Sequence, residues 1–124
     1  MQGLLRDQAM VQMTVGQAEA ALRSGRAFLL EAVREIWAAS SSGTLALEHR
    51  ANLRLATTHG IRLAAQIIDS IYNASGATAA YEDHLLQRHF QDIHVITQHL
   101  QGRLAHYELI GRYWLGLKID EARL

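Results

Sequence analysis

The stretch SSSGT, residues 40–44, decides the fold, because it separates two long segments that each carry a continuous apolar stripe. Serine side chains compete with the backbone for hydrogen bonds, and Gly43 can adopt the left-handed conformation in which helices commonly end. The stretch therefore predicts the end of one helix over about residues 4–39. It also predicts the start of a second helix over about residues 45–73, with Thr44 as its cap.

Apolar residues recur at spacings of three, four and seven on both sides of this break, which is the pattern of an amphipathic helix. The stripe before the break contains Val11, Val15, Ala18, Leu22, Leu29, Val33 and Ile36. The stripe after it contains Leu53, Leu55, Ala56, Ile61, Ala64, Ile67, Ile68 and Ile71. Because proline is absent and alanine, leucine, arginine and glutamine dominate, composition favours helix throughout.

The last third of the chain predicts two shorter helices. The small-residue loop ASGATAA, residues 74–80, is followed by a helical pattern over about residues 82–99. Gly102 then marks a break before a fourth helix over about residues 104–115. The tail KIDEARL, residues 118–124, carries no such pattern and is expected to be loosely held.

Four amphipathic helices joined by short connections predict an all-α protein, an up-and-down four-helix bundle. At 124 residues the chain is long enough for one core, and no linker or internal repeat divides it. We therefore expect a single helical-bundle domain over residues 1–124.

Composition and charge exclude several classes of function. Cysteine is absent, so disulfides, thiolate metal sites and cysteine nucleophiles are excluded. The formal net charge is zero and the arginines are scattered, so nucleic acid is not an expected partner. The apolar runs are interrupted by polar residues and no secretory signal is visible, so we expect no membrane span and a cytoplasmic location.

Histidines return at every fifth position between residues 84 and 99, as His84, His89, His94 and His99. A step of five residues rotates the side chain by about 140° and raises it by about 7.5 Å, so neighbours in the series point to different sides of a helix. Ligands for one ion on a single helix stand three or four residues apart, so no metal site is expected here. The simplest interpretation of the four is that they lie on a polar helix surface.

Sequence motifs around His99 give that residue a second interpretation. The runs LQRHFQDIHVITQH, residues 86–99, and AHYELIGRYWLG, residues 105–116, resemble the end of the C-terminal domain of the acyl-CoA dehydrogenase superfamily. Within it they are most similar to the reduced-flavin-dependent monooxygenases, which hydroxylate aromatic or polycyclic substrates. The matching positions are Leu86, Gln87, Arg88, Phe90, Asp92, His94, Gln98, His99, Tyr107, Glu108, Leu109, Gly111 and Arg112. The runs RSGRAFLLEAV, HRANLRLATTHGIR and SGATAAY extend the resemblance over nearly the whole chain.

This resemblance implies specific roles for three residues. Acyl-CoA dehydrogenases proper usually carry a catalytic glutamate near this point, whereas Gln98 and His99 stand there in this chain. The matching histidine of the monooxygenases lines the flavin pocket and is implicated in proton transfer, which implies a catalytic role for His99. Imidazole suits that role because its ordinary pKa of about 6.5 lets it exchange protons near neutral pH. The loop SGATAAY implies flavin contacts at Gly76 and Ala77, although a plain turn between helices explains the same residues.

The resemblance also implies a reduced flavin, FMN or FAD, and it bears on partners. Members of this superfamily are several times longer, and their N-terminal helical and middle β domains have no counterpart in these 124 residues. We therefore expect a C-terminal bundle that contributes part of a flavin or substrate pocket and is inactive alone. The alternatives are a helical self-association module, forming a dimer or tetramer, and a subunit that completes a flavin site with a partner chain.

Exposed apolar residues would favour self-association. Leu30, Leu55 and Ile110 are expected to lie on such patches where the other domains of the superfamily do not cover the helices. Trp37 and Trp114 lie within apolar stripes and are expected either in the core or at a subunit interface.

Overall fold

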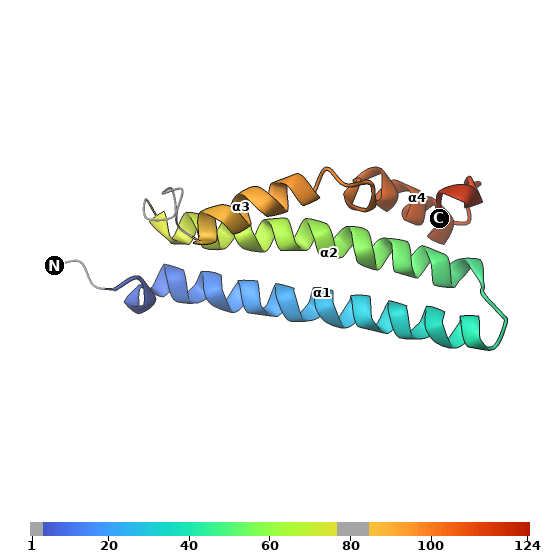
Figure 1. The fold of residues 1–124 in the computed structure, drawn as a ribbon, viewed down its shortest axis with the longest axis horizontal. Coiled ribbons are helices and arrows are strands. Elements are labelled where there is room, and N and C mark those ends of the chain that lie inside the picture. The colour runs from blue at the N-terminus through green and yellow to red at the C-terminus, as the bar shows by residue number, and fades with distance from the viewer. Residues whose placement is uncertain (1–3, 77–84) are drawn as a thin grey trace.

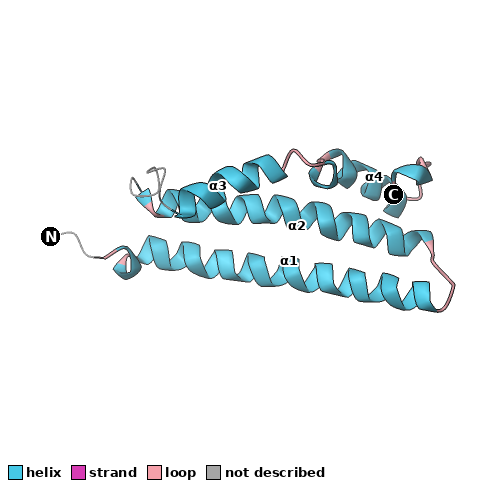
Figure 2. Cartoon of the chain, viewed as in Figure 1, coloured by secondary structure: helices cyan, strands magenta, loops and turns pink. Residues whose placement is uncertain are grey.

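The structure is a computed structural model that describes residues 4–76 and 85–124, and every element in these two ranges is helical (Figure 2). The four α-helices are α1 (Ala9–Ser41), α2 (Leu47–Ala74), α3 (Leu85–Ile96) and α4 (Ala105–Trp114). Three single turns of 3₁₀ helix accompany them, η1 (Leu5–Asp7), η3 (Leu100–Gly102) and η4 (Glu121–Arg123). The predicted all-α fold of two long and two short helices is confirmed.

Helix α2 lies at the centre of the molecule (Figure 1). α1 runs antiparallel to it on one side, and α3 and α4 lie on the other side. α3 follows the C-terminal half of α2, whereas α4 follows its N-terminal half, so the two short helices succeed one another along the same partner. α2 therefore carries the contacts that place both short helices and the turn between them.

The turn between α1 and α2 ends the first helix as predicted and starts the second one differently. Gly43 has a φ of +77°, the left-handed conformation that glycine adopts without strain. The N–H of Thr44 donates to the carbonyl of Ala39 at 3.0 Å, so Thr44 belongs to the end of α1. The prediction of Thr44 as the cap of α2 is therefore wrong. Ala46 takes the N-cap position, and its N–H donates to His49 Nδ1 at 3.1 Å.

Small residues let α1 and α2 approach closely. A Cβ added to Gly25 on α1 would lie 2.8 Å from Leu63 Cδ2 on α2, closer than real side chains come. The buried alanines of the two helices are Ala32, Ala51, Ala56 and Ala65. Packing in this hairpin is therefore apolar, and it depends on short side chains rather than large ones.

A hydrophobic core cluster joins the start of α2 to α4 and to the tail. We call it the core cluster, and its residues are Ala51, Leu109, Ile110 and Leu124. The tail is fixed as well by Arg50, which donates to the carbonyl of Glu121 at 3.0 Å. The expectation of a loosely held tail is therefore wrong, because its last leucine is buried and its backbone accepts hydrogen bonds from α2.

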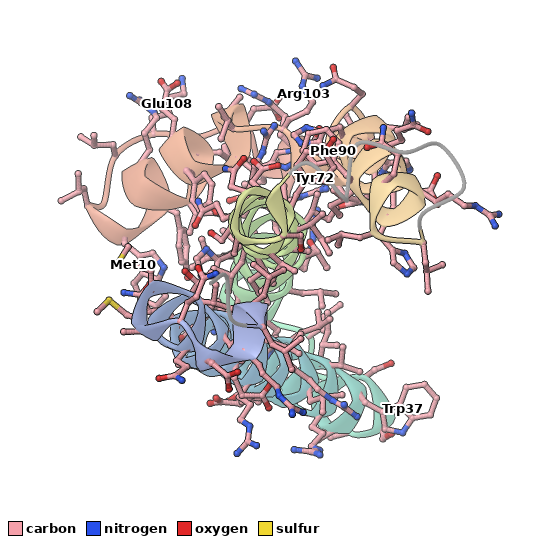
Figure 3. All side chains as sticks on the ribbon, turned by 90° about the vertical axis from the view of Figure 1, so that its left-hand side faces the viewer. Met10, Trp37, Tyr72, Phe90, Arg103 and Glu108 are labelled. Carbon is pink, nitrogen blue, oxygen red and sulfur yellow. The ribbon has the colours of Figure 1, made fainter. Side chains whose placement is uncertain are left out.

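Residues expected on the surface divide into two groups. Ile110 is only 2% exposed and Leu55 packs against the core cluster, so neither forms a surface patch. Leu30 is exposed, as expected. The expectation of core packing for the tryptophans is wrong, because Trp37 is 75% and Trp114 56% exposed. Figure 3 shows Trp37 projecting from α1 away from the other helices.

None of the helices within residues 4–76 and 85–124 combines the length and apolar character needed to cross a bilayer.

Candidate functional site

His99 lies in a turn and not on a helix. The expected helix over residues 82–99 ends at Ile96, and His99 takes the N-cap position of η3 with extended backbone. Its Nδ1 atom accepts a hydrogen bond from the N–H of Gln101 at 3.2 Å. Since a backbone N–H can only donate, Nδ1 must be unprotonated, and the neutral ring carries its proton on Nε2. The exposed imidazole therefore offers Nε2 as its free nitrogen.

The helix ends at Ile96 for local reasons. The N–H groups of Gln98 and His99 bond three residues back, which tightens the last turn into 3₁₀ form. The hydroxyl of Thr97 donates to the carbonyl of His94 at 2.7 Å and so competes with helical backbone bonding. The predicted end was therefore three residues too late.

His99 lies at the edge of a groove of about 580 Å³ between α1, α2, α3 and the turn. The lining is almost wholly apolar, with leucines and isoleucines from all three helices. Among the described lining residues, Arg26 and His99 are the titratable ones. The groove therefore suits an apolar ligand that meets an imidazole at one edge.

Three side chains of α2 hold the turn around His99, and we call them the turn clamp: Arg54, Thr58 and Arg62. Their spacing of four residues places them on one face of the helix. Thr58 Oγ1 donates to the Gln101 carbonyl at 2.6 Å, and Arg62 Nε donates to the Gly102 carbonyl at 2.7 Å.

The two arginines of the turn clamp make two further contacts. Arg54 donates to the side-chain oxygen of Gln101 at 2.7 Å, and the second arm of Arg62 lies 3.5 Å from the Thr97 carbonyl. The turn clamp therefore contacts the chain both before and after His99.

A buried histidine supports the turn clamp from α4. His106 Nδ1 lies 2.8 Å from Thr58 Oγ1, and because that hydroxyl already donates to the Gln101 carbonyl, it accepts a bond from His106. Burial lowers the pKa of His106 from its ordinary value of 6.5, and the nearby Arg54 guanidinium lowers it further. His106 is therefore held in its neutral form, with the proton on Nδ1.

A second pair of side chains, His59 and Tyr107, meets across the contact between α2 and α4. His59 Nδ1 lies 3.0 Å from the hydroxyl of Tyr107, with the two rings edge to face. Burial raises the pKa of the Tyr107 phenol above its ordinary value, against a smaller opposite effect of Arg62. The phenol therefore stays protonated at neutral pH and can donate to the imidazole.

Gly76, one of the two predicted flavin contacts, lies elsewhere. Gly76 follows α2 with a φ of +67°, and a Cβ added there would meet nothing within 4 Å. Gly76 does not line the groove, and it follows Ala74, the last residue of α2, which stands about 24 Å along the helix axis from Thr58, at 1.5 Å per residue. Ala77 lies outside the described residues. The structure therefore does not bring Gly76 to the groove edge where His99 lies.

His89 and His94, two other histidines of the series, do not join His99. His89 is exposed, and His94 Nε2 lies 2.7 Å from Asp69 Oδ1 on the surface between α2 and α3. Phe90 packs between His94 and Tyr72 beside that pair, at the α2–α3 contact visible in Figure 3. His84 lies outside the described residues. Within the part of the chain that the structure describes, no three histidine or carboxylate side chains converge as metal ligands.

Sequence patterns alone missed the turn clamp and His106. A signal was present, because an amphipathic helix with arginine, threonine and arginine at positions 54, 58 and 62 carries a polar stripe. Such a polar stripe is typical of a helix face that contacts solvent. Only the fold reveals that the chain crosses it at residues 97–102.

Comparison with known proteins identifies the class of this helical domain. Residues 3–103 match the family described as "Acyl-CoA dehydrogenase, C-terminal domain". The chain belongs to this family, as its resemblance implied.

Two relatives carry monooxygenase names. The indole-3-acetate monooxygenase of Pseudomonas putida is 36% identical over 113 residues, which cover 90% of this chain and 29% of that protein. The indole-3-acetate monooxygenase of Acinetobacter baumannii is 26% identical over 115 residues, covering 92% and 30%. The chain thus spans about a third of the length of these curated relatives.

A solved structure shares the fold. The crystal structure of 3-HSA hydroxylase from Rhodococcus sp. RHA1 matches with a TM-score of 0.89 and 22% identity. The match covers 100% of this chain and 33% of that one.

Proposed function

We propose that this chain serves as the C-terminal helical domain of a flavin-dependent monooxygenase, with His99 as its proton-handling residue. The observation that carries the proposal is the position of His99 at the edge of an apolar groove, with Nδ1 bonded to its own backbone and Nε2 free. The names of the relatives support the reaction class.

The groove fits the planar ring of a reduced flavin better than its charged phosphate groups. Its apolar walls suit a planar ring or an aromatic substrate, whereas Arg26 is the single cation among its described lining residues. Reduced FMN or FAD, when bound, would supply the activation of oxygen. The walls of the groove and His99 would contribute one side of the pocket, and further parts of the protein or a partner chain would cover the open side.

His99 presents Nε2 to the groove, because Nδ1 is engaged by the Gln101 N–H. In the neutral ring Nε2–H donates a hydrogen bond, which would orient a hydroxyl group of a bound ligand. Transfer of a proton from Nε2 requires the imidazolium form, with a second proton on Nδ1, because a neutral imidazole is too weak an acid to give up its only N–H proton. His99 would therefore act as an acid by passing from imidazolium to neutral imidazole, and Nδ1 gives up its bond from the Gln101 N–H whenever it carries that second proton.

Anaerobic titration with reduced and oxidised FMN and FAD tests the proposal, followed by fluorescence or calorimetry. We expect binding of reduced flavin that His99→Ala weakens and His89→Ala leaves unchanged, because His89 is exposed and does not line the groove. Equal binding by His99→Ala and the unaltered chain would contradict the role of His99. Absence of flavin binding, even with the N-terminal helical and middle β domains of the superfamily supplied as a partner chain, would contradict the assignment of function.

A second function, self-association, is favoured by the exposed apolar residues of α1 and of the α4 end. Trp37, Trp114 and Leu115 are each more than half exposed, which is unusual for large apolar side chains. We propose that these residues form contacts between copies of the protein in a dimer or tetramer. Light scattering of the chain and of Trp37→Glu tests this, with a lower mass expected for the variant; a monomeric parent chain would contradict it.

A further inference from the structure

The turn that carries His99 has little structure of its own. Its internal bonds join Gly102 N–H to the His99 carbonyl and Arg103 N–H to the Leu100 carbonyl, besides the bond from Gln101 N–H to the His99 ring. A single 3₁₀ turn has poor hydrogen-bond geometry and rarely persists alone. The conformation of the turn therefore needs support from its neighbours.

Helix α2 supplies that support through two residues that bond the backbone on both sides of His99. Arg62 reaches the carbonyl of Gly102 at 2.7 Å and, more weakly, that of Thr97 at 3.5 Å. Thr58, which is fully buried, donates to the Gln101 carbonyl at 2.6 Å. Charged donors make the stronger hydrogen bonds, and buried ones are costly to break.

These bonds reach the imidazole through one residue, Gln101, whose N–H and carbonyl belong to the two peptide units on either side of its Cα. The N–H of Gln101 binds His99 Nδ1, and the carbonyl of the same residue accepts from Thr58. Fixing the carbonyl limits the rotation of Gln101, and so it limits the direction in which the N–H points. Thr58 is oriented in turn by His106, whose Nδ1–H donates to the hydroxyl.

Close packing removes the remaining freedom of the turn. A Cβ added to Gly102 would lie 3.0 Å from Ile61 Cγ2 and 3.2 Å from the Thr97 carbonyl. The turn therefore rests directly on α2 next to Arg62, and a side chain at residue 102 would force the two apart.

We propose that Arg62 and Thr58 are positioning residues for His99, which fix the Nε2–H tautomer of the imidazole at the groove edge. The proposal rests on the function proposed for His99, but the tautomer can be measured without flavin. Neither residue needs to touch the reacting atoms, since Thr58 does not line the groove and Arg62 acts through backbone carbonyls.

The test is long-range ¹H–¹⁵N NMR of the full chain labelled with ¹⁵N-histidine, at about pH 8, where an ordinary imidazole is neutral. In the unaltered protein we expect His99 to carry its proton on Nε2. Thr58→Val and Arg62→Gln should release the Gln101 N–H and lower the ratio of the two tautomers by about fivefold, the value of one net hydrogen bond.

Matched controls separate positioning from general loosening. Arg50→Gln removes another α2 guanidinium that binds a backbone carbonyl, that of Glu121 in the tail. Thr14→Val removes a threonine hydroxyl that bonds within its own helix. Both controls should leave the His99 tautomer unchanged. Thr58→Ser keeps the hydroxyl and should behave like the parent chain.

The outcomes decide the proposal whether or not every variant folds. An unchanged tautomer in folded Thr58→Val and Arg62→Gln would overturn it, and so would an equal change in the two controls. If Arg62→Gln does not fold, Arg62→Lys replaces it, with a smaller tautomer change expected because one ammonium group cannot span both carbonyls. If His99→Ala leaves flavin binding unchanged, the proposed role of His99 is overturned, whereas the measured effect of Thr58 and Arg62 on the His99 tautomer still stands.

Discussion

Two parts of the contact between α2 and the last third of the chain are held in opposite ways. At the start of α2, the core cluster joins it to α4 and the tail through leucine, isoleucine and alanine side chains. Further along α2, the turn clamp holds residues 97–102 through hydrogen bonds to two backbone carbonyls and to the side-chain oxygen of Gln101. Apolar packing stabilises helices whose backbone is already satisfied, whereas a short non-helical turn offers carbonyls that only polar partners can hold.

The core cluster should account for most of the stability. Ile110→Ala removes a side chain that is almost fully buried, which we expect to lower the free energy of unfolding by about 2–5 kcal/mol. Urea unfolding followed by circular dichroism measures this change. Val95→Ala, at an exposed position, should change it by less than about 0.5 kcal/mol. A similar cost for both variants would contradict the importance of the core cluster.

The turn clamp should have a smaller effect on stability and a larger one on the site. Thr58→Val keeps the shape of the side chain but leaves the Gln101 carbonyl and the His106 N–H without their partner. We expect a loss of about 1–3 kcal/mol in the same unfolding experiment. A cost equal to that of Ile110→Ala would remove the contrast between the core cluster and the turn clamp.

The buried His106 makes the stability of this region depend on pH. Its pKa is lowered in the folded protein, so the unfolded chain binds the proton more readily. The free energy of unfolding should therefore be unaffected by this group above pH 6.5 and should fall as the pH drops below 6.5. Unfolding at pH 7.5 and 5.5 should show a smaller pH dependence in His106→Gln than in the parent chain. An unchanged dependence would mean that other groups cause it.

Exposed polar contacts on α2 should contribute least. His94 and Asp69 form a bond of 2.7 Å, but their side chains are 45% and 44% exposed. Asp69→Ala should therefore lower the free energy of unfolding by no more than about 1 kcal/mol, because solvent screens the pair. The effect should shrink further at high salt. A cost matching that of Thr58→Val would show that burial does not set the value of these contacts.

The helices were predictable because their signals are local. The apolar spacing on both sides of SSSGT and the left-handed Gly43 are properties of neighbouring residues, and both appear in the structure. The end of α3 was predicted three residues late because the 3₁₀ bonds of Gln98 and His99 and the hydroxyl bond of Thr97 leave no trace in the apolar spacing. The tail was misjudged because its partners Arg50 and Arg54 are about 70 residues distant along the chain.

The site was predicted only in part. The family resemblance directed attention to His99, which lines the groove. Neither the orientation of its ring nor the support from Thr58, Arg62 and His106 follows from spacing, because these residues meet only after α2 and α4 have packed. Gly76 and Ala77 stay predictions, with Gly76 away from the groove and Ala77 outside the described residues.

The distance along the chain between α2 and the His99 turn also sets the order in which the molecule assembles. The turn joining α1 to α2 closes between neighbouring residues, but the bonds to Gln101 and Gly102 close loops of 40 residues or more. Long loops cost more entropy to close, so the hairpin should form first and the His99 turn last. In native-state hydrogen exchange, the Gly102 amide should accordingly exchange sooner than the amides in the middle of α2. The turn that carries His99 is then held less persistently than the two long helices on which it packs.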